Sequence, residues 1–123
     1  MKKLSWLFVA LVFLLTACGA KPTDSYETIG IHEVQQKQES GSIVLDVREA
    51  EEFEEGHIIG AINAPLSGLK TGSRYDLNPE ESYVVICRSG NRSKEASEIL
   101  FTDGYDVVNV SEGMASWTGE VEQ

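Results

Sequence analysis

The chain has 123 residues, which is long enough for one modest hydrophobic core and too short for two. Twenty acidic against ten basic side chains give a formal net charge of -10. This charge argues against nucleic acid as a partner, because proteins that bind it neutralise phosphates with a basic face.

The first seventeen residues have the layout of an export signal. Lys2 and Lys3 provide a positive start, and an apolar run follows at residues 6–15. The run is too short to span a membrane, which takes about 20 apolar residues. The sequence LTAC at residues 15–18 resembles the lipobox of bacterial lipoproteins, which implies that Cys18 carries lipid after cleavage. An ordinary signal peptide or an uncleaved anchor is the alternative.

Processing before Cys18 would anchor the protein by its lipid to a bacterial cell membrane or outer membrane. It would leave eight basic against twenty acidic side chains, a formal charge of -12. Cys87 would then have no partner for an intramolecular disulfide, and a single thiol with two histidines offers no metal site. The predicted organisation is a signal peptide at 1–17, a lipidated cysteine and tether at 18–25, and one domain at 26–123.

Apolar runs rich in β-branched residues predict five strands. A short strand at the start of the domain and a strand ended by Pro65 accompany three more apolar ones. The five are expected at residues 26–29, 43–47, 61–64, 83–86 and 107–110.

Helices are predicted between these strands. A weak helix is expected at 31–38, a short acidic helix with Phe53 facing inward at 49–56, and a helix capped by Gly104 at 93–101. Residues 66–81 are expected to be irregular with one helical turn at 66–69, and a short last helix is expected through Met114 and Trp117. Strands alternating with helices predict an α/β fold, an open parallel sheet with helices on both faces.

The segment VVICRSGNRS at residues 84–93 is the strongest candidate site. The strand would bring Cys87 to the carboxyl edge of the sheet, where open α/β sheets bind ligands. Gly90 would let the loop turn into the helix, so that free backbone N–H groups surround the sulfur and lower the thiol pKa from about 8.5. Arg88 and Arg92 add positive charge, so the loop is predicted to hold an anion. A buried, inert cysteine before a solvated turn is the alternative.

Three segments in this order and spacing resemble a single-domain rhodanese, a sulfurtransferase-type domain, over residues 26–117. They are LDVREAEEFEEGHIIGAINAP at 45–65, VVICRSGNRS at 84–93 and VVNVSEGMASW at 107–117. The resemblance implies the rhodanese-like fold and a persulfide on Cys87. A small anionic sulfur donor (thiosulfate, polysulfide or a persulfide) would load the cysteine, and a thiol, a cyanide-like acceptor or a partner protein's thiol would take the sulfur. No metal or organic cofactor is implied.

The same resemblance implies roles for further residues. The loop that cradles the sulfur and the donor would be formed by Arg88, Ser89, Gly90, Asn91, Arg92 and Ser93. Arg88 and Arg92 would orient a dianionic donor, whereas Asp46, Arg48 and His57 are expected to support the fold. Ile59 and Glu112 stand where the family often has proline and glycine, which leaves the rigidity of their loops open.

Two other functions remain as alternatives. Cysteine-dependent phosphatases of similar fold need a loop one residue longer, with arginine six positions after the cysteine. Here Arg92 lies five positions after Cys87, and the sixth position is Ser93. The second alternative is a persulfide-carrying or regulatory rhodanese-like binding module.

Overall fold

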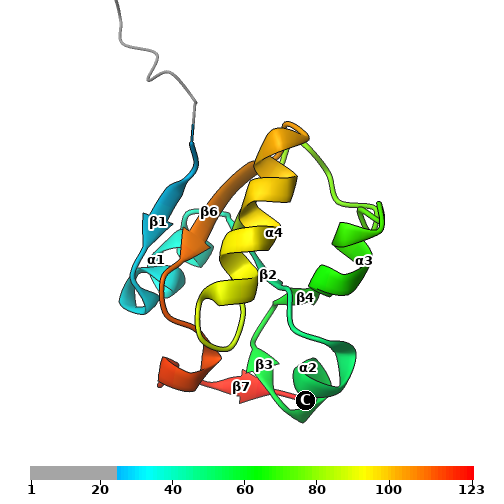
Figure 1. Ribbon diagram of the computed structural model, residues 1–123. Coiled ribbons are helices and arrows are strands. Elements are labelled where there is room, and N and C mark those ends of the chain that lie inside the picture. The colour runs from blue at the N-terminus through cyan, green and yellow to red at the C-terminus, as the bar shows by residue number, and fades with distance from the viewer. Residues whose placement is uncertain (1–24) are drawn as a thin grey trace, which may run out of the picture.

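A sheet of five parallel strands forms the centre of the computed structural model, which describes residues 25–123 (Figure 1). The strand order is β1-β6-β5-β2-β4. The bounds are Glu27–Ile29 for β1, Ile43–Asp46 for β2, Ile62–Asn63 for β4, Ser82–Ile86 for β5 and Asp106–Val110 for β6. The central strand β5 is an apolar run because both faces of the sheet are covered.

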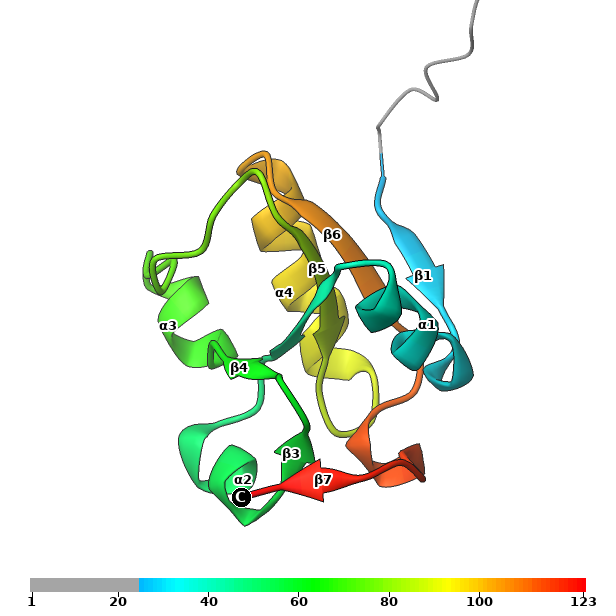
Figure 2. The ribbon, with the colours of Figure 1, turned by 180° about the vertical axis from the view of Figure 1, so that it is seen from behind.

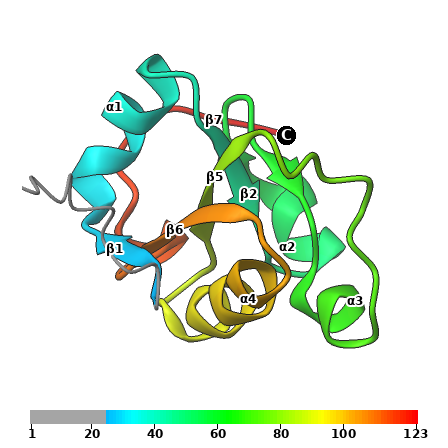
Figure 3. The ribbon, with the colours of Figure 1, turned by 90° about the horizontal axis from the view of Figure 1, so that it is seen from above.

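Helices cover both faces of this sheet, as the views from behind and from above show (Figures 2 and 3). Helices α3 and α4 lie on one face and α1 lies on the other. The bounds are Ile31–Glu33 for the 3-10 turn η1, Val34–Glu39 for α1, Ala50–Glu55 for α2, Leu66–Lys70 for α3, Asn91–Thr102 for α4 and Met114–Ser116 for the 3-10 turn η2. The predicted fold class is therefore confirmed.

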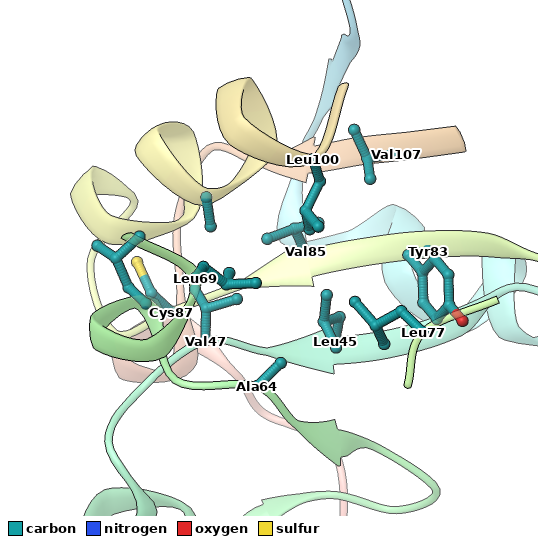
Figure 4. Close-up of a cluster of buried hydrophobic side chains, with 12 residues drawn as sticks. Leu45, Val47, Ala64, Leu69, Leu77, Tyr83, Val85, Cys87, Leu100 and Val107 are labelled. Atoms are coloured by element: carbon teal, nitrogen blue, oxygen red, sulfur yellow. The ribbon is translucent and has the colours of Figure 1, made fainter. Parts of the chain in front are cut away.

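The pleat of β5 divides the core into two clusters. Val85 and Cys87 belong to the cluster under α3 and α4, whereas Val84 and Ile86 belong to the cluster on the opposite face. Figure 4 shows the first cluster, with the sulfur of Cys87 at one end, near Leu69. The thiol of Cys87 is thus continuous with the hydrophobic core.

Helix α4 has one buried face toward the sheet. Its buried residues repeat at three- and four-residue spacing, as an amphipathic helix requires. They are Ser93, Ala96, Ser97 and Leu100. The helix ends as predicted at Gly104, whose φ of +90° suits glycine, and Tyr105 N–H closes the cap on the carbonyl of Leu100 at 3.0 Å.

All five predicted strands are present, with small shifts in their ends. The helix expected at 93–101 begins two residues earlier, at Asn91, because Gly90 turns the chain directly into it with a φ of +98°. The last predicted helix is the 3-10 turn η2, which ends before Trp117. Residues 66–81 contain only the short helix α3, close to the predicted turn.

A second, antiparallel sheet of two short strands was not predicted from the sequence. These are β3 (His57–Ile58) and β7 (Val121–Glu122), which pair near the carboxyl end of the chain. The two strands are short and lie far apart in the chain, so no local pattern indicates that they pair.

The predicted signal peptide, Cys18 and most of the tether lie outside the described residues. Within residues 25–123, no helix has both the length and the apolar character needed to cross a membrane.

Candidate active site

Cys87 lies directly after β5, where the chain turns into α4. Its side chain is 1% exposed, and the backbone N–H of Gly90 donates a hydrogen bond to its Sγ over 3.1 Å. Gly90 adopts a left-handed conformation that brings the loop back toward the sulfur. The N-terminus of α4, which is the positive end of its helix dipole, therefore lies beside the thiol.

The surroundings of Cys87 favour its thiolate. Burial alone would raise the pKa of the thiol, but hydrogen bonds from the side chain and backbone of Ser93 and from the N–H groups of Gly90 and Ser89 outweigh it. The pKa of Cys87 is consequently lowered. The hydroxyl of Ser93 also lies 3.2 Å from the carbonyl of Gly90, so its single proton can turn to the sulfur when the thiolate forms.

The segment that follows β6 holds the backbone of the cysteine loop by hydrogen bonds. The N–H groups of Met114 and Ala115 donate to the carbonyls of Cys87 at 2.8 Å and Arg88 at 3.1 Å. A Cβ on Gly113 would lie 2.3 Å from the carbonyl carbon of Arg88, and one on Gly90 would lie 2.2 Å from the carbonyl oxygen of Ser111. Such close backbone contact admits only glycine at both positions. The shape of the loop thus depends on two segments far apart in the sequence.

The two arginines of the loop have different surroundings. Arg88 is exposed and has no ion pair among residues 25–123. Arg92 is bound by Glu52 of α2 through two bonds, Nη1 to Oε2 at 2.6 Å and Nη2 to Oε1 at 2.9 Å. Glu52 was not predicted as a site residue, because nothing in the sequence distinguishes it within the acidic run EAEEFEE.

The remaining loop residues differ in exposure. Ser89 and Asn91 are exposed, whereas Ser93 is fully buried under the loop. Ser93 is therefore the loop hydroxyl that lies closest to the buried side of the sulfur, and Ser89 contributes through its backbone N–H.

Asp46 and Arg48 form a buried ion pair at the end of β2. Arg48 Nη2 lies 2.7 Å from Asp46 Oδ2 and also donates to the carbonyl of Gly56 at 2.8 Å. Both side chains are at most 9% exposed. The pair fastens the end of α2 to the sheet, and neither residue contacts Cys87 in the hydrogen-bond network, which fits a supporting role.

His57 also contacts α2. Its ring stacks on Phe53 with centroids 3.6 Å apart, and its Nδ1 lies 2.8 Å from the Phe53 carbonyl. Because a carbonyl only accepts, Nδ1 carries the proton. The other ring nitrogen lies 3.4 Å from Glu122 of β7, so His57 joins the carboxyl-terminal strand to α2.

The two departures from the family pattern make contacts of their own. Glu112 accepts hydrogen bonds from the hydroxyl of Ser111 at 2.6 Å and from the N–H of Ile31 at 3.1 Å. The bond from Ser111, and after it the bond from Ile31, lower the pKa of Glu112. Ile59 is exposed, and its carbonyl accepts a bond from Gln38 at 3.0 Å. Both loops are therefore held by contacts other than those a glycine or proline would provide.

Two features lie apart from the cysteine loop. A hollow of about 990 Å³ beside Tyr26, Phe101 and Tyr105 includes no residue of the loop. Among residues 25–123, no three histidine, cysteine or carboxylate side chains gather where they could hold a metal ion.

Comparison with known proteins identifies the class to which this fold and loop belong. Residues 31–120 match the rhodanese-like domain family. The chain belongs to this family, as its three sequence segments predicted.

Solved structures support the same assignment. A rhodanese-related protein from Thermoplasma volcanium has a TM-score of 0.72 and 35% identity, over 79% of this chain and 98% of that one. A rhodanese-like domain protein from Staphylococcus aureus has a TM-score of 0.69 and 31% identity, over 78% of this chain and 96% of that one.

Relatives by sequence include two proteins of Bacillus subtilis. YrkF, provisionally named a sulfur carrier protein, is 37% identical over 107 residues, which are 85% of this chain and 57% of YrkF. YtwF, provisionally named a sulfurtransferase, is 38% identical over 79 residues, which are 64% of this chain and 76% of YtwF. The chain thus spans little more than half the length of YrkF. The names of both relatives refer to the handling of sulfur.

Proposed function

We propose that the protein is a sulfurtransferase that carries a sulfane sulfur as a persulfide on Cys87. The observation that supports this most directly is the bond from Gly90 N–H to Sγ at 3.1 Å, within a loop that lowers the thiol pKa. Membership of the rhodanese-like family and the sulfur-handling names of its relatives support the same chemistry.

The first half-reaction loads the cysteine. The Cys87 thiolate attacks the outer sulfur of thiosulfate, a new S–S bond forms, and the sulfur–sulfur bond of the donor breaks. Sulfite leaves with the electron pair of that bond, so the negative charge on the protein moves to the terminal sulfur of the persulfide. The loop N–H groups of Ser89, Gly90 and Ser93, which stabilise the thiolate, are placed to stabilise this charge as well.

The second half-reaction returns the cysteine. A nucleophile such as cyanide or a thiolate attacks the terminal sulfur, and the S–S bond of the persulfide breaks with its electron pair returning to Cys87. With cyanide the product is thiocyanate. Polysulfide or the persulfide of another protein can enter the same scheme as donor, and a partner's thiol can enter it as acceptor.

A phosphatase or a binding module without chemistry has less support. The backbone N–H of Gly90 donates to Sγ itself, and Arg92 lies five positions after Cys87, one fewer than such phosphatases need. A loop of this length suits one sulfur atom rather than a phosphate. An intact cysteine loop also favours chemistry over binding alone.

We further propose that residues 1–17 direct export and that Cys18 anchors the domain to a bacterial envelope membrane. The support is the sequence LTAC after a short apolar run. The test compares the parent with Cys18→Ser in a bacterial host fed labelled palmitate. Label and membrane association in the parent alone support the anchor, and their absence in the parent overturns it.

The decisive test of sulfur transfer is a measurement of intact mass. The full chain carrying Cys18→Ser, in which Cys87 is the only thiol, is incubated with thiosulfate beside the Cys18→Ser/Cys87→Ser variant. A gain of one sulfur atom in the first alone, reversed by cyanide with release of thiocyanate, is expected. No gain from thiosulfate, polysulfide or an alkyl persulfide, with Cys87 still open to alkylation, would overturn the proposal.

A further inference from the structure

The guanidinium of Arg92 is held by Glu52 on both of its terminal nitrogens. The two bonds are 2.6 Å and 2.9 Å long, a bidentate geometry that fixes the plane of the guanidinium. Glu52 is itself fixed, since its Oε2 accepts the backbone N–H of Glu49 at 3.0 Å in the first turn of α2. This ion pair at the edge of the cysteine loop is thus a built contact between two elements.

The pair cancels much of the positive charge that the sequence places beside the sulfur. The hydrogen bond from Arg92 is the main cause that lowers the pKa of Glu52 to about 2, so Glu52 is ionised at neutral pH. The pKa of Arg92 is raised, first by its bond to Glu52 and also by the nearby Cys87 thiolate. Arg92 therefore lies within electrostatic reach of the sulfur, but with a carboxylate already bound.

A dianionic donor would meet this carboxylate at the loop. To bind Arg92, thiosulfate must displace Glu52 or lie next to it, and both cost free energy because like charges repel. The persulfide of a thiol carries one charge at most on its reacting group, so the same carboxylate penalises it less. The pair thereby separates the two donor classes by charge.

We propose that Glu52 is a specificity-determining residue, which acts through Arg92 to weaken the use of dianionic donors and so favours an alkyl persulfide as the source of sulfur. The inference rests on the proposed sulfur transfer at Cys87 and names the donor class for it. Atoms balance as before: the alkyl persulfide gives its terminal sulfur to the Cys87 thiolate and leaves as a thiol or thiolate.

The test compares Glu52→Gln with its parent, both in the full chain carrying Cys18→Ser. The amide oxygen of glutamine can take the place of Oε2, which accepts from Arg92 and from Glu49 N–H, whereas the second bond to Arg92 is lost together with the charge. Donors are thiosulfate and the persulfide of N-acetylcysteine methyl ester, whose amino and carboxyl groups are blocked. Cyanide is the acceptor, and thiocyanate is measured.

We expect Glu52→Gln to raise kcat/KM for thiosulfate about fivefold, mainly by lowering KM, the size expected for removing one like charge at a partly exposed site. The rate with the blocked persulfide should stay within about twofold. Glu52→Asp keeps the charge and should keep the parent's weak use of thiosulfate. Glu54→Gln is the matched control, because it removes the same charge from an exposed position of α2.

The other outcomes contradict the inference in distinct ways. A fall with both donors in Glu52→Gln would mean that Glu52 only supports the loop. An equal gain in Glu54→Gln would mean that net charge, not the contact with Arg92, limits thiosulfate. If neither of these donors nor polysulfide loads Cys87 in the parent, the proposed function fails, and this inference fails with it.

Discussion

Gly113 lies so close to Arg88 that a methyl group on it would come within 2.3 Å of the Arg88 carbonyl oxygen. The backbone of Gly113 is extended, with a φ of -164°, so other residues could adopt its conformation. The need for glycine there is therefore steric. The segment after β6 packs against the backbone of the cysteine loop. The N–H groups of Met114 and Ala115 hold the loop there by hydrogen bonds to its carbonyls.

Replacing Gly113 with alanine should disturb the site more than the fold. The added methyl must push the Cys87–Arg88 backbone away, at a cost of about 1–3 kcal/mol in the free energy of unfolding. The loop N–H groups would then no longer converge on the sulfur. We expect sulfur loading from thiosulfate to fall at least about tenfold at temperatures where the variant remains folded.

Gly41→Ala is the control for that variant. Gly41 has a φ of +99° and open space around its Cβ position, so alanine there strains the backbone without touching the site. It should cost about 1–2 kcal/mol in the free energy of unfolding and leave sulfur loading unchanged. Parent-like sulfur loading in Gly113→Ala would show that the packing of the segment after β6 does not determine the shape of the cysteine loop.

Alkylation of Cys87 should report a lowered pKa. Reaction with neutral iodoacetamide follows the thiolate fraction, so its pH profile in the folded Cys18→Ser chain should bend at a lower pH than in the same chain unfolded in urea. Ser93→Ala removes the main hydrogen bond to the thiolate and should move the folded profile to higher pH. Coincident profiles for folded and unfolded chains would contradict the lowered pKa.

The free energy of unfolding should depend on pH through the ionisation of Cys87. Because the pKa of Cys87 is lower in the folded chain, the unfolded chain binds more protons between the two pKa values, and stability rises with pH there. This contribution is complete above the unfolded pKa of about 8.5 and is lost as the pH falls through the folded pKa. This rise in the free energy of unfolding with pH should be absent from the Cys87→Ser variant.

Much of this site could be predicted from the sequence because its chemistry is local. Cys87, Gly90 and Ser93 lie close together in the sequence, where a strand leads into a helix. A single continuous segment therefore contains the loop that surrounds the sulfur. Glu52 could not be found this way, since its partner Arg92 is 40 positions away and four other glutamates surround it in the run 49–55.

The fold shows the same division between local and distant information. The apolar runs of the parallel strands predicted the sheet, because burial on both faces leaves a clear pattern. The pairing of β3 with β7 depends on contacts between residues 57 and 122, which no local pattern reveals. The packing of Gly113 against the cysteine loop could not be predicted for the same reason, because it is a contact between residues far apart in the sequence.

Asp46→Asn should destabilise the domain strongly. The change leaves the guanidinium of Arg48, 9% exposed, without its buried carboxylate partner, at an expected cost of about 3–5 kcal/mol in the free energy of unfolding. Glu95→Gln is the comparison, because it breaks the exposed pair of Lys70 and Glu95, which should cost about 0–1 kcal/mol. Urea unfolding of both variants measures the difference. Equal losses would show that the Asp46–Arg48 pair is not fastening α2 to the sheet.

The salt dependence of sulfur loading should depend on the charge of the donor. The chain carries a formal net charge of -10, so at low salt it repels a dianion before the dianion reaches the exposed Arg88. Added salt shortens the range of this repulsion to about 8–10 Å at 0.1–0.15 M. Loading of Cys87 by thiosulfate should therefore become faster as sodium chloride rises from about 10 mM to about 150 mM.

A donor without a second charge provides the control for this effect. Loading by the persulfide of N-acetylcysteine methyl ester should change less over the same range, because this donor carries at most one negative charge. Alkylation by iodoacetamide, which is neutral, should change little. Stopped-flow measurement of sulfite release and of thiol release separates the two donors. A thiosulfate rate that falls as salt is added would mean that attraction by Arg88 and Arg92 outweighs the acidic surface. It would then be the local charge of the loop, rather than that of the whole domain, that governs the approach of the donor.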